Sequence, residues 1–273
     1  YGRLQRLEID IMARVGLIGF GYLGSFVYEQ MIARPELGLD VAFVYNRSVE
    51  RLQDVHPEHI LGDLHNFAER NPDLVVELAH PDISRQFGGA FLACADYMPL
   101  SLTCLADVDL ERYLLDTAGD NSTRLCVPHG AVIGLDALSE GRDMWDEVSI
   151  TMKKPPRSID FSDCPTYCAE DIEEETVLYD GPTRRVCALF PRNVNSHAAT
   201  AMAGVGFERT RSVLVADPAL DVSVIELSAR GRGVEIDIRR ANPMQGVSGV
   251  LTLLSSLASI GRASGPRDPL FIC

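Results

Sequence analysis

The chain has 273 residues, of which 46% are hydrophobic, and it carries a formal net charge of −14 at pH 7. This length predicts two domains, and the acidic balance argues against nucleic acid or an anionic membrane surface as the main partner. No apolar run reaches the roughly 20 residues that a membrane-spanning helix needs. The seven cysteines are scattered without a C-x-x-C pair, which favours free thiols in the cytoplasm and argues against a zinc site.

The first part of the chain predicts a parallel sheet with helices on both faces. Residues 1–11 precede the first strand pattern, and we treat them as an extension outside the fold. From residue 12 to residue 128, short apolar runs alternate with amphipathic ones, as in ARVGLIG followed by GSFVYEQMIARP. Strands that helices cover on both faces have this apolar character. We therefore expect residues 12–128 to form one α/β domain.

Later in the chain, strand-like segments follow one another directly. The residues at 234–239 alternate apolar with charged side chains, the period-2 pattern of a sheet with one wet face. Residues 129–241 therefore predict an α+β domain with a mixed or antiparallel sheet, for substrate binding and dimerisation. Residues 242–273 predict a C-terminal helix that returns to the first domain. The acidic segment 169–176 is typical of a solvated loop, so we expect no metal site.

Gly19, Gly21 and Gly24 follow the first apolar strand and open a helical pattern, with the spacing G-x-G-x-x-G. In a Rossmann domain the first glycine permits a tight turn, the second lets the backbone approach a pyrophosphate, and the third lets helix and strand pack closely. This context predicts a bound dinucleotide, with Tyr22 and Leu23 among its contacts. A plain turn between strand and helix is the alternative.

The second strand pattern bears on the choice between NAD and NADP. It ends in Asn46, Arg47 and Ser48, without the acidic residue that would bond a ribose 2′-hydroxyl. Arg47 suits the 2′-phosphate of NADP, so NADP is favoured over NAD; a solvated loop cation is the alternative. The nicotinamide is expected beyond the carboxyl ends of the strands, near Ala79.

Segments spread over nearly the whole chain resemble the L-aspartate dehydrogenase family, among them GFGYLG, DLVVELA, SLTCLAD, PHGAVIGLDAL, TMKKPP and NVNSHAATAMA. The resemblance implies a Rossmann domain joined to an α+β domain in a protein that is usually a homodimer. It implies an NAD(P)-dependent oxidoreductase that interconverts L-aspartate with oxaloacetate and ammonia, through iminoaspartate. It also implies that Ala131 and Asn195 contact the cofactor, although Asn195 could equally cap the helix that follows it.

The resemblance breaks where the family carries its proposed acid/base histidine, because this chain has Ile225 at that position. An aliphatic side chain transfers no proton, so the candidate catalytic groups are His197 and His129, with His80 as a third. The substrate is expected to be a small dicarboxylate amino or keto acid. Its carboxylates need cations, and because neighbouring residues of a strand point to opposite faces, one of two adjacent lysines should face the cleft. The candidate cations are Lys153, Lys154 and Arg192.

Two other functions remain open from the residues. In one, the chain is a dinucleotide-binding sensor or binding protein that has lost its chemistry, because Ile225 replaces the histidine. In the other, it is a related imine or keto-acid reductase that acts on another dicarboxylate. Composition and motif spacing lead to an NAD(P)-binding protein of two domains, and only the resemblance names aspartate.

Overall fold

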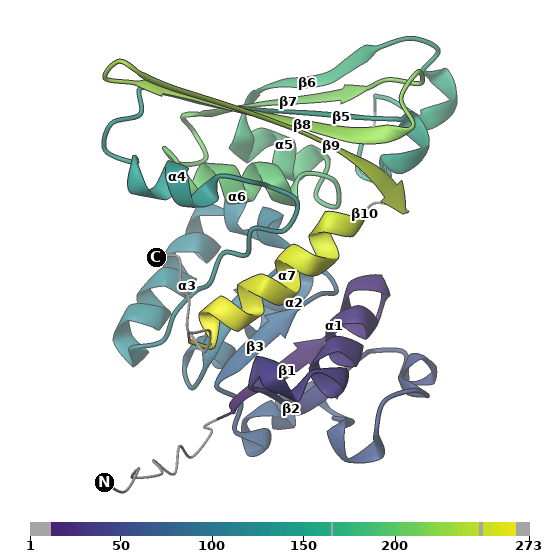
Figure 1. Cartoon of the computed structure of the whole chain (residues 1–273), viewed down its shortest axis with the longest axis vertical. Helices are drawn as coiled ribbons and strands as arrows, with labels where there is room; N and C mark the ends of the chain where they lie inside the picture. The colour runs from purple at the N-terminus through teal and green to yellow at the C-terminus, as the bar shows by residue number, and fades with distance from the viewer. Residues whose placement is uncertain (1–11, 165, 246–247, 266–273) are drawn as a thin grey trace, which may run out of the picture.

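A computed structural model describes residues 12–164, 166–245 and 248–265, which form two units that are each built on one β-sheet (Figure 1). The first unit holds a four-stranded parallel sheet in the order β2-β1-β3-β4. Its strands are short and their side chains are almost all buried, as expected for a sheet covered on both faces. They are β1 (Ala13–Ile18), β2 (Leu39–Tyr45), β3 (Leu74–Glu77) and β4 (Asp96–Pro99).

Helices cover both faces of this sheet: α1 (Tyr22–Ala33), α2 (Pro81–Leu92), α3 (Val108–Asn121) and α7 (Val250–Ala263). Because successive side chains of a strand point to opposite faces, β1 contributes to two separate cores. Val15 and Leu17 share one core with α1 and with Leu257 of α7. Ile18 shares the other core with Phe91 of α2 and with α3. The C-terminal helix α7 therefore lies against the first sheet, beside α1 (Figure 1).

The second unit holds a six-stranded sheet in the order β10-β9-β8-β5-β7-β6, in which β5 and β7 are parallel and the other neighbours are antiparallel. Helices α4 (Leu135–Glu140), α5 (Thr183–Leu189) and α6 (Asn195–Ala203) lie between this sheet and the first unit (Figure 1). The expected fold class, a Rossmann-type sheet followed by a second, mixed sheet, is confirmed. The strands are β5 (Glu147–Lys154), β6 (Thr176–Pro182), β7 (Thr210–Ala216), β8 (Val222–Gly231), β9 (Val234–Gln245) and β10 (Ser248–Gly249).

Strand β5 shows why one lysine becomes buried. Val148, Ile150 and Met152 pack into the core that α6 shares, and Lys154 follows them in the same phase. In the sheet register Met152 lies opposite Ile225 of β8. The alternation that buries three apolar side chains therefore buries a cation at the end of the strand.

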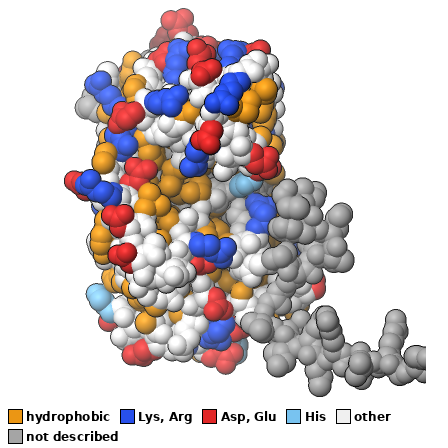
Figure 2. Space-filling view, turned by 90° about the vertical axis from the view of Figure 1, so that its left-hand side faces the viewer, with side chains coloured by type: hydrophobic (Ala, Val, Ile, Leu, Met, Phe, Trp, Pro, Cys, Tyr) orange, Lys and Arg blue, Asp and Glu red, His pale blue; other side chains and the backbone are white. Residues whose placement is uncertain are grey.

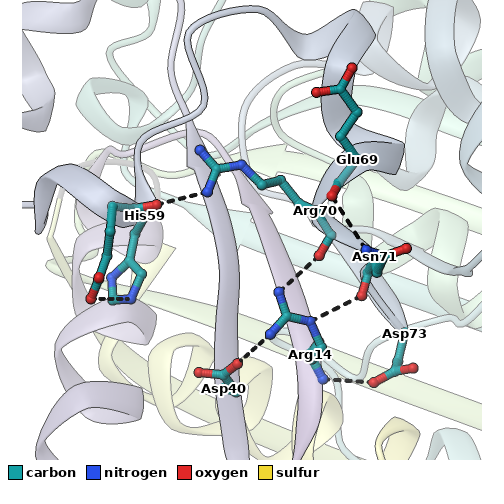
Figure 3. Close-up of polar contacts among 8 residues, drawn as sticks. Arg14, Asp40, His59, Glu69, Arg70, Asn71 and Asp73 are labelled. Carbon is teal, nitrogen blue, oxygen red and sulfur yellow. Dashed lines mark hydrogen bonds and ion pairs between the residues drawn. The ribbon is translucent and has the colours of Figure 1, made fainter.

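At the amino ends of the first unit's strands, Arg14 forms a polar network (Figure 3). Its guanidinium pairs with Asp40 of β2 at 2.8 Å and donates to the backbone oxygens of Arg70 and Asn71 at 2.9 and 3.2 Å. Its backbone N–H donates to Asp73 Oδ2 at 2.8 Å. The glycine turn lies at the carboxyl end of β1. This network therefore stabilises the sheet at the opposite end of its strands, away from the turn.

The surface shown in Figure 2 interleaves acidic and basic side chains, and neither sign gathers into one continuous field. None of the helices within the described ranges is long and apolar enough to cross a membrane. Over those same residues, no group of three His, Cys, Asp or Glu side chains is placed to hold a metal ion.

Candidate active site

The glycine turn after β1 combines tight packing with open space. Gly19 has a φ of +103°, and a Cβ there would lie 2.7 Å from the carbonyl oxygen of Leu78. A Cβ at Gly24 would lie 2.1 Å from the carbonyl oxygen of Gly19. At Gly21, the residue before α1, a Cβ would meet no described atom within 4 Å. The turn thus leaves room at the amino end of a helix, where phosphate oxygens are stabilised by free N–H groups and the helix dipole.

The end of β2 supports this turn. Asn46 Oδ1 accepts a hydrogen bond from the backbone N–H of Phe20 at 3.1 Å, and its Nδ2 donates to the backbone oxygen of Ser48 at 2.8 Å. Arg47 is exposed and forms no hydrogen bond or ion pair with any other described residue. Of the two residues inside the motif, Tyr22 begins α1 on the surface and Leu23 lines the cavity described below.

Glu77 joins the ends of β3 and β4. Its fully buried carboxylate accepts hydrogen bonds from the backbone N–H of Ala79 at 2.6 Å and from the N–H and Oγ of Ser101, both at 3.0 Å. Burial raises the pKa of Glu77, and these donors oppose the rise. Ala79 and Ser101 both line the cavity, so this carboxylate fixes two loops at the edge where the nicotinamide is expected.

A cavity of about 450 Å³ lies between the strand ends of the first unit and the helix-covered face of the second sheet. Its size is typical of a small-molecule site. Several residues predicted from the sequence line it, from both units: Leu23, Ala79, His129, Ala131, Lys154, Arg192 and Asn195. Asn195 is the first residue of α6 and does not cap it; its Oδ1 accepts from the backbone N–H of Thr103 at 3.2 Å and thereby links the two units.

Two buried cations stand in the wall of this cavity. Lys154 is 4% exposed and Arg240 of β9 is 8% exposed. Arg240 Nη1 donates to the backbone oxygen of Ala131 at 2.6 Å, while its Nε has no partner within the described structure. Burial, reinforced by the charge of Arg240, lowers the pKa of Lys154 to about 8. Neither cation pairs with a carboxylate of the described residues, which is unusual for buried charge.

The other two predicted cations have acidic partners. Lys153 does not line the cavity, because it points to the other face of β5 and pairs with Glu175 at 3.2 Å. Arg192 lines the cavity and pairs with Asp160 at 3.1 Å. Of the two adjacent lysines, only Lys154 therefore lines the cavity.

The candidate histidines differ in access to the cavity. His197 is fully buried in α6, it does not line the cavity, and its ring nitrogens have no partner among the described residues. Burial, then the charge of Lys154, lowers its pKa to about 3. His129 lines the cavity, and burial followed by Arg262 lowers its pKa. His80 also lines the cavity, and its ring accepts from the backbone N–H of Asp82 at 3.3 Å.

Ile225 lies in the cavity wall, 3% exposed, directly between Arg240 on β9 and Met152 on β5 in the sheet register. Ser196 also lines the cavity, and its buried Oγ has no hydrogen-bond partner in the described part of the chain. Sequence reasoning overlooked Arg240, Ser196 and Glu77. A signal for Arg240 was present, because Arg240 continues the apolar phase of Ile236 and Ile238 on β9.

Comparisons with known proteins agree with this geometry. The family model "Homoserine dehydrogenase, NAD binding domain" matches residues 19–128, and "Aspartate dehydrogenase, C-terminal" matches residues 136–263. An aspartate dehydrogenase domain-containing protein of Danio rerio is 34% identical over 97% of this chain and 99% of its own length. L-aspartate dehydrogenase 1 of Bordetella pertussis is 32% identical over 80% of this chain and 82% of its own.

A solved structure shows the same fold. Aspartate dehydrogenase from Thermotoga maritima matches with a TM-score of 0.71 over 92% of this chain and 94% of that one, at 23% identity. The parallel sheet, the glycine turn and the matched NAD-binding model define an NAD(P)-dependent oxidoreductase. The chain belongs to the aspartate dehydrogenase family, as its sequence motifs predicted.

Proposed function

We propose that this dehydrogenase interconverts L-aspartate with oxaloacetate and ammonia, through iminoaspartate, and uses NAD(P) as the hydride carrier. The observation that carries the proposal is the pair of buried cations, Lys154 and Arg240, on a cavity wall without an acidic partner among the described residues. Uncompensated buried charge is costly, so such a wall suits a ligand that brings negative charge. L-aspartate brings negative charge in its carboxylates, and Arg240, which stays charged at every working pH, can bind one of them.

The residues of the first unit fit a dinucleotide. In our proposal the open space at Gly21 takes the pyrophosphate, and Ala79, Ala131 and Asn195 lie at the nicotinamide end. The exposed, unpaired Arg47 supports a preference for NADP, because its guanidinium can bond the 2′-phosphate. When bound, the nicotinamide supplies the acceptor for the hydride that leaves the substrate's α-carbon.

We extend the proposal to a homodimer in the cytoplasm. On the face of the second sheet that points away from α4, α5 and α6, Thr151 and Val213 are partly exposed. This face leaves room for a second copy of the chain. Six free cysteines among the described residues support a reducing compartment.

A catalytically weak or inactive dinucleotide-binding protein is the second candidate. It is favoured by Ile225, an aliphatic side chain in the cavity wall at the position where the family resemblance places a proton-transferring histidine. In this case the cavity would bind cofactor and a dicarboxylate without turnover.

An assay with purified protein separates the two. NADPH or NADH is mixed with oxaloacetate and ammonium, and the loss of nicotinamide absorbance is followed, with a Gly21→Val variant as a control for cofactor binding. Oxidation that requires protein, oxaloacetate and ammonium together supports the aspartate reaction. Oxidation without ammonium instead indicates a keto-acid reductase. Cofactor binding in a fluorescence titration without oxidation favours the inactive binder.

A further inference from the structure

The chain uses lysine very sparingly. Of its 25 Lys and Arg residues, only Lys153 and Lys154 are lysines, and they are adjacent on β5. Arginine keeps its charge at every working pH, whereas a lysine amine in a buried site is able to release its proton. Lys153 pairs with Glu175 on the outer face of the sheet. Lys154 is therefore the one lysine amine in the cavity, beside an arginine that stays charged.

The groups around Lys154 favour its neutral form. Arg240 of β9 and His197 of α6 are the charged and titratable side chains that interact with it. The facing residues of β8, Ser223 and Ile225, are uncharged. The carboxylate of Asp217, which follows β7, bonds locally and not to Lys154: its Oδ1 accepts a hydrogen bond from the backbone N–H of Ala219 at 2.9 Å. The described structure thus gives the amine no carboxylate that would hold its proton, in accord with its lowered pKa.

We propose that Lys154 is the general base of the reaction, and that Arg240 binds a substrate carboxylate next to it. This inference rests on the proposed function. In deamination, the neutral amine of Lys154 takes one proton from the substrate's α-ammonium group, which frees the nitrogen lone pair. The hydride then leaves the α-carbon for the nicotinamide as the C=N bond forms. Water adds to that bond, ammonium leaves with oxaloacetate, and Lys154 releases its proton to solvent.

The histidines are less suited to this step. His197 does not line the cavity, whereas Lys154 does. His129 does line it, but its backbone N–H bonds to Ser259 Oγ of α7, and its charged neighbours are Arg262 and Asp136 rather than Arg240. A substrate carboxylate on Arg240 lies on the second sheet, on the same wall as Lys154.

Because the chain has two lysines, the base is testable by NMR of protein with isotope-labelled lysine. The Lys153→Arg variant leaves Lys154 as the only lysine signal. We expect the Lys154 amine to titrate near pH 8, below the ordinary lysine value of 10.5. A Lys154 amine that titrates at or above the ordinary lysine value of 10.5 overturns the assignment whatever the activity.

Kinetics supply the second test, with Lys153→Arg as the matched control. In Lys154→Arg, aspartate deamination should fall about 100-fold or more, whereas the affinities for NADP⁺ and for succinate, a dicarboxylate without an amine, should stay within about threefold. Wild-type kcat/KM should rise with pH through about 8 and the variant should lose that rise. Lys154→Met should also be inactive.

The outcomes separate the two proposals. An active wild type whose Lys154→Arg variant keeps its turnover overturns the base and leaves the proposed function standing. In that case a His129→Gln variant that loses turnover would identify the base instead. A wild type that binds NADP⁺ and succinate without turnover overturns the proposed function, and the assignment of a base falls with it.

Discussion

Replacing Lys154 with methionine is expected to stabilise the protein at neutral pH while it abolishes turnover. Methionine keeps the length of the unbranched stem and removes the charge that burial disfavours. The folded-state pKa of Lys154 is about 8, below its ordinary value of 10.5. Since each pKa unit corresponds to about 1.4 kcal/mol, the buried charge costs the folded state about 3 kcal/mol below pH 8.

The sign of the pH dependence follows from the same two values. Between pH 8 and 10.5 the unfolded chain binds a proton at Lys154 that the folded chain has released. The wild type's free energy of unfolding therefore rises with pH across this window relative to the variant's. The gain of about 3 kcal/mol from Lys154→Met should be complete below about pH 8 and should vanish above about pH 10.5.

Urea unfolding followed by tryptophan fluorescence measures this difference. Trp145 is the chain's only tryptophan, it is buried, and its Nε1 donates to the backbone oxygen of Leu138 at 3.0 Å in the unit that holds Lys154. Lys153→Met is the control, because that side chain is partly exposed and should give little gain. A Lys154→Met protein that is no more stable than wild type at pH 7, or a gain independent of pH, would refute the reasoning.

Three further predictions concern the cofactor site and the core. Gly24→Ala should lower the melting temperature, because the added Cβ would lie 2.1 Å from the Gly19 carbonyl oxygen. Gly21→Val should melt at the wild-type temperature but bind NADPH at least about tenfold more weakly. An unchanged NADPH affinity of Gly21→Val would contradict this role of Gly21. Between pH 6.5 and about 3 the His197 ring takes up a proton in the unfolded state but not in the folded state, so the wild type loses stability as the pH falls through this window. His197→Gln should therefore be less sensitive to acid in unfolding followed by circular dichroism. Arg47→Ala should weaken NADPH binding about tenfold and leave NADH binding unchanged; equal losses for both cofactors would exclude a role in 2′-phosphate recognition.

The glycine turn was accessible to sequence reasoning because its signals are local. Gly19, Gly21 and Gly24 lie within six residues, and their spacing carries meaning only between a strand and a helix, both of which the apolar pattern showed. The lining of the cavity was only partly accessible. The alternation of β5 predicted that one of two lysines faces the cleft, but which face is covered depends on helices α4, α5 and α6, which lie outside the strand.

The sequence by itself determined the two sheets, the glycine turn and the family, because strand periodicity and short motifs depend on neighbours along the chain. Only the tertiary structure decided which side chains line the cavity. Strand β8 pairs with β5 on one side and β9 on the other, and this register brings Lys154, Ile225 and Arg240 to one cavity. It also leaves both cations without a described acidic partner. Such an arrangement depends on strand pairing and burial, which act between residues distant in sequence.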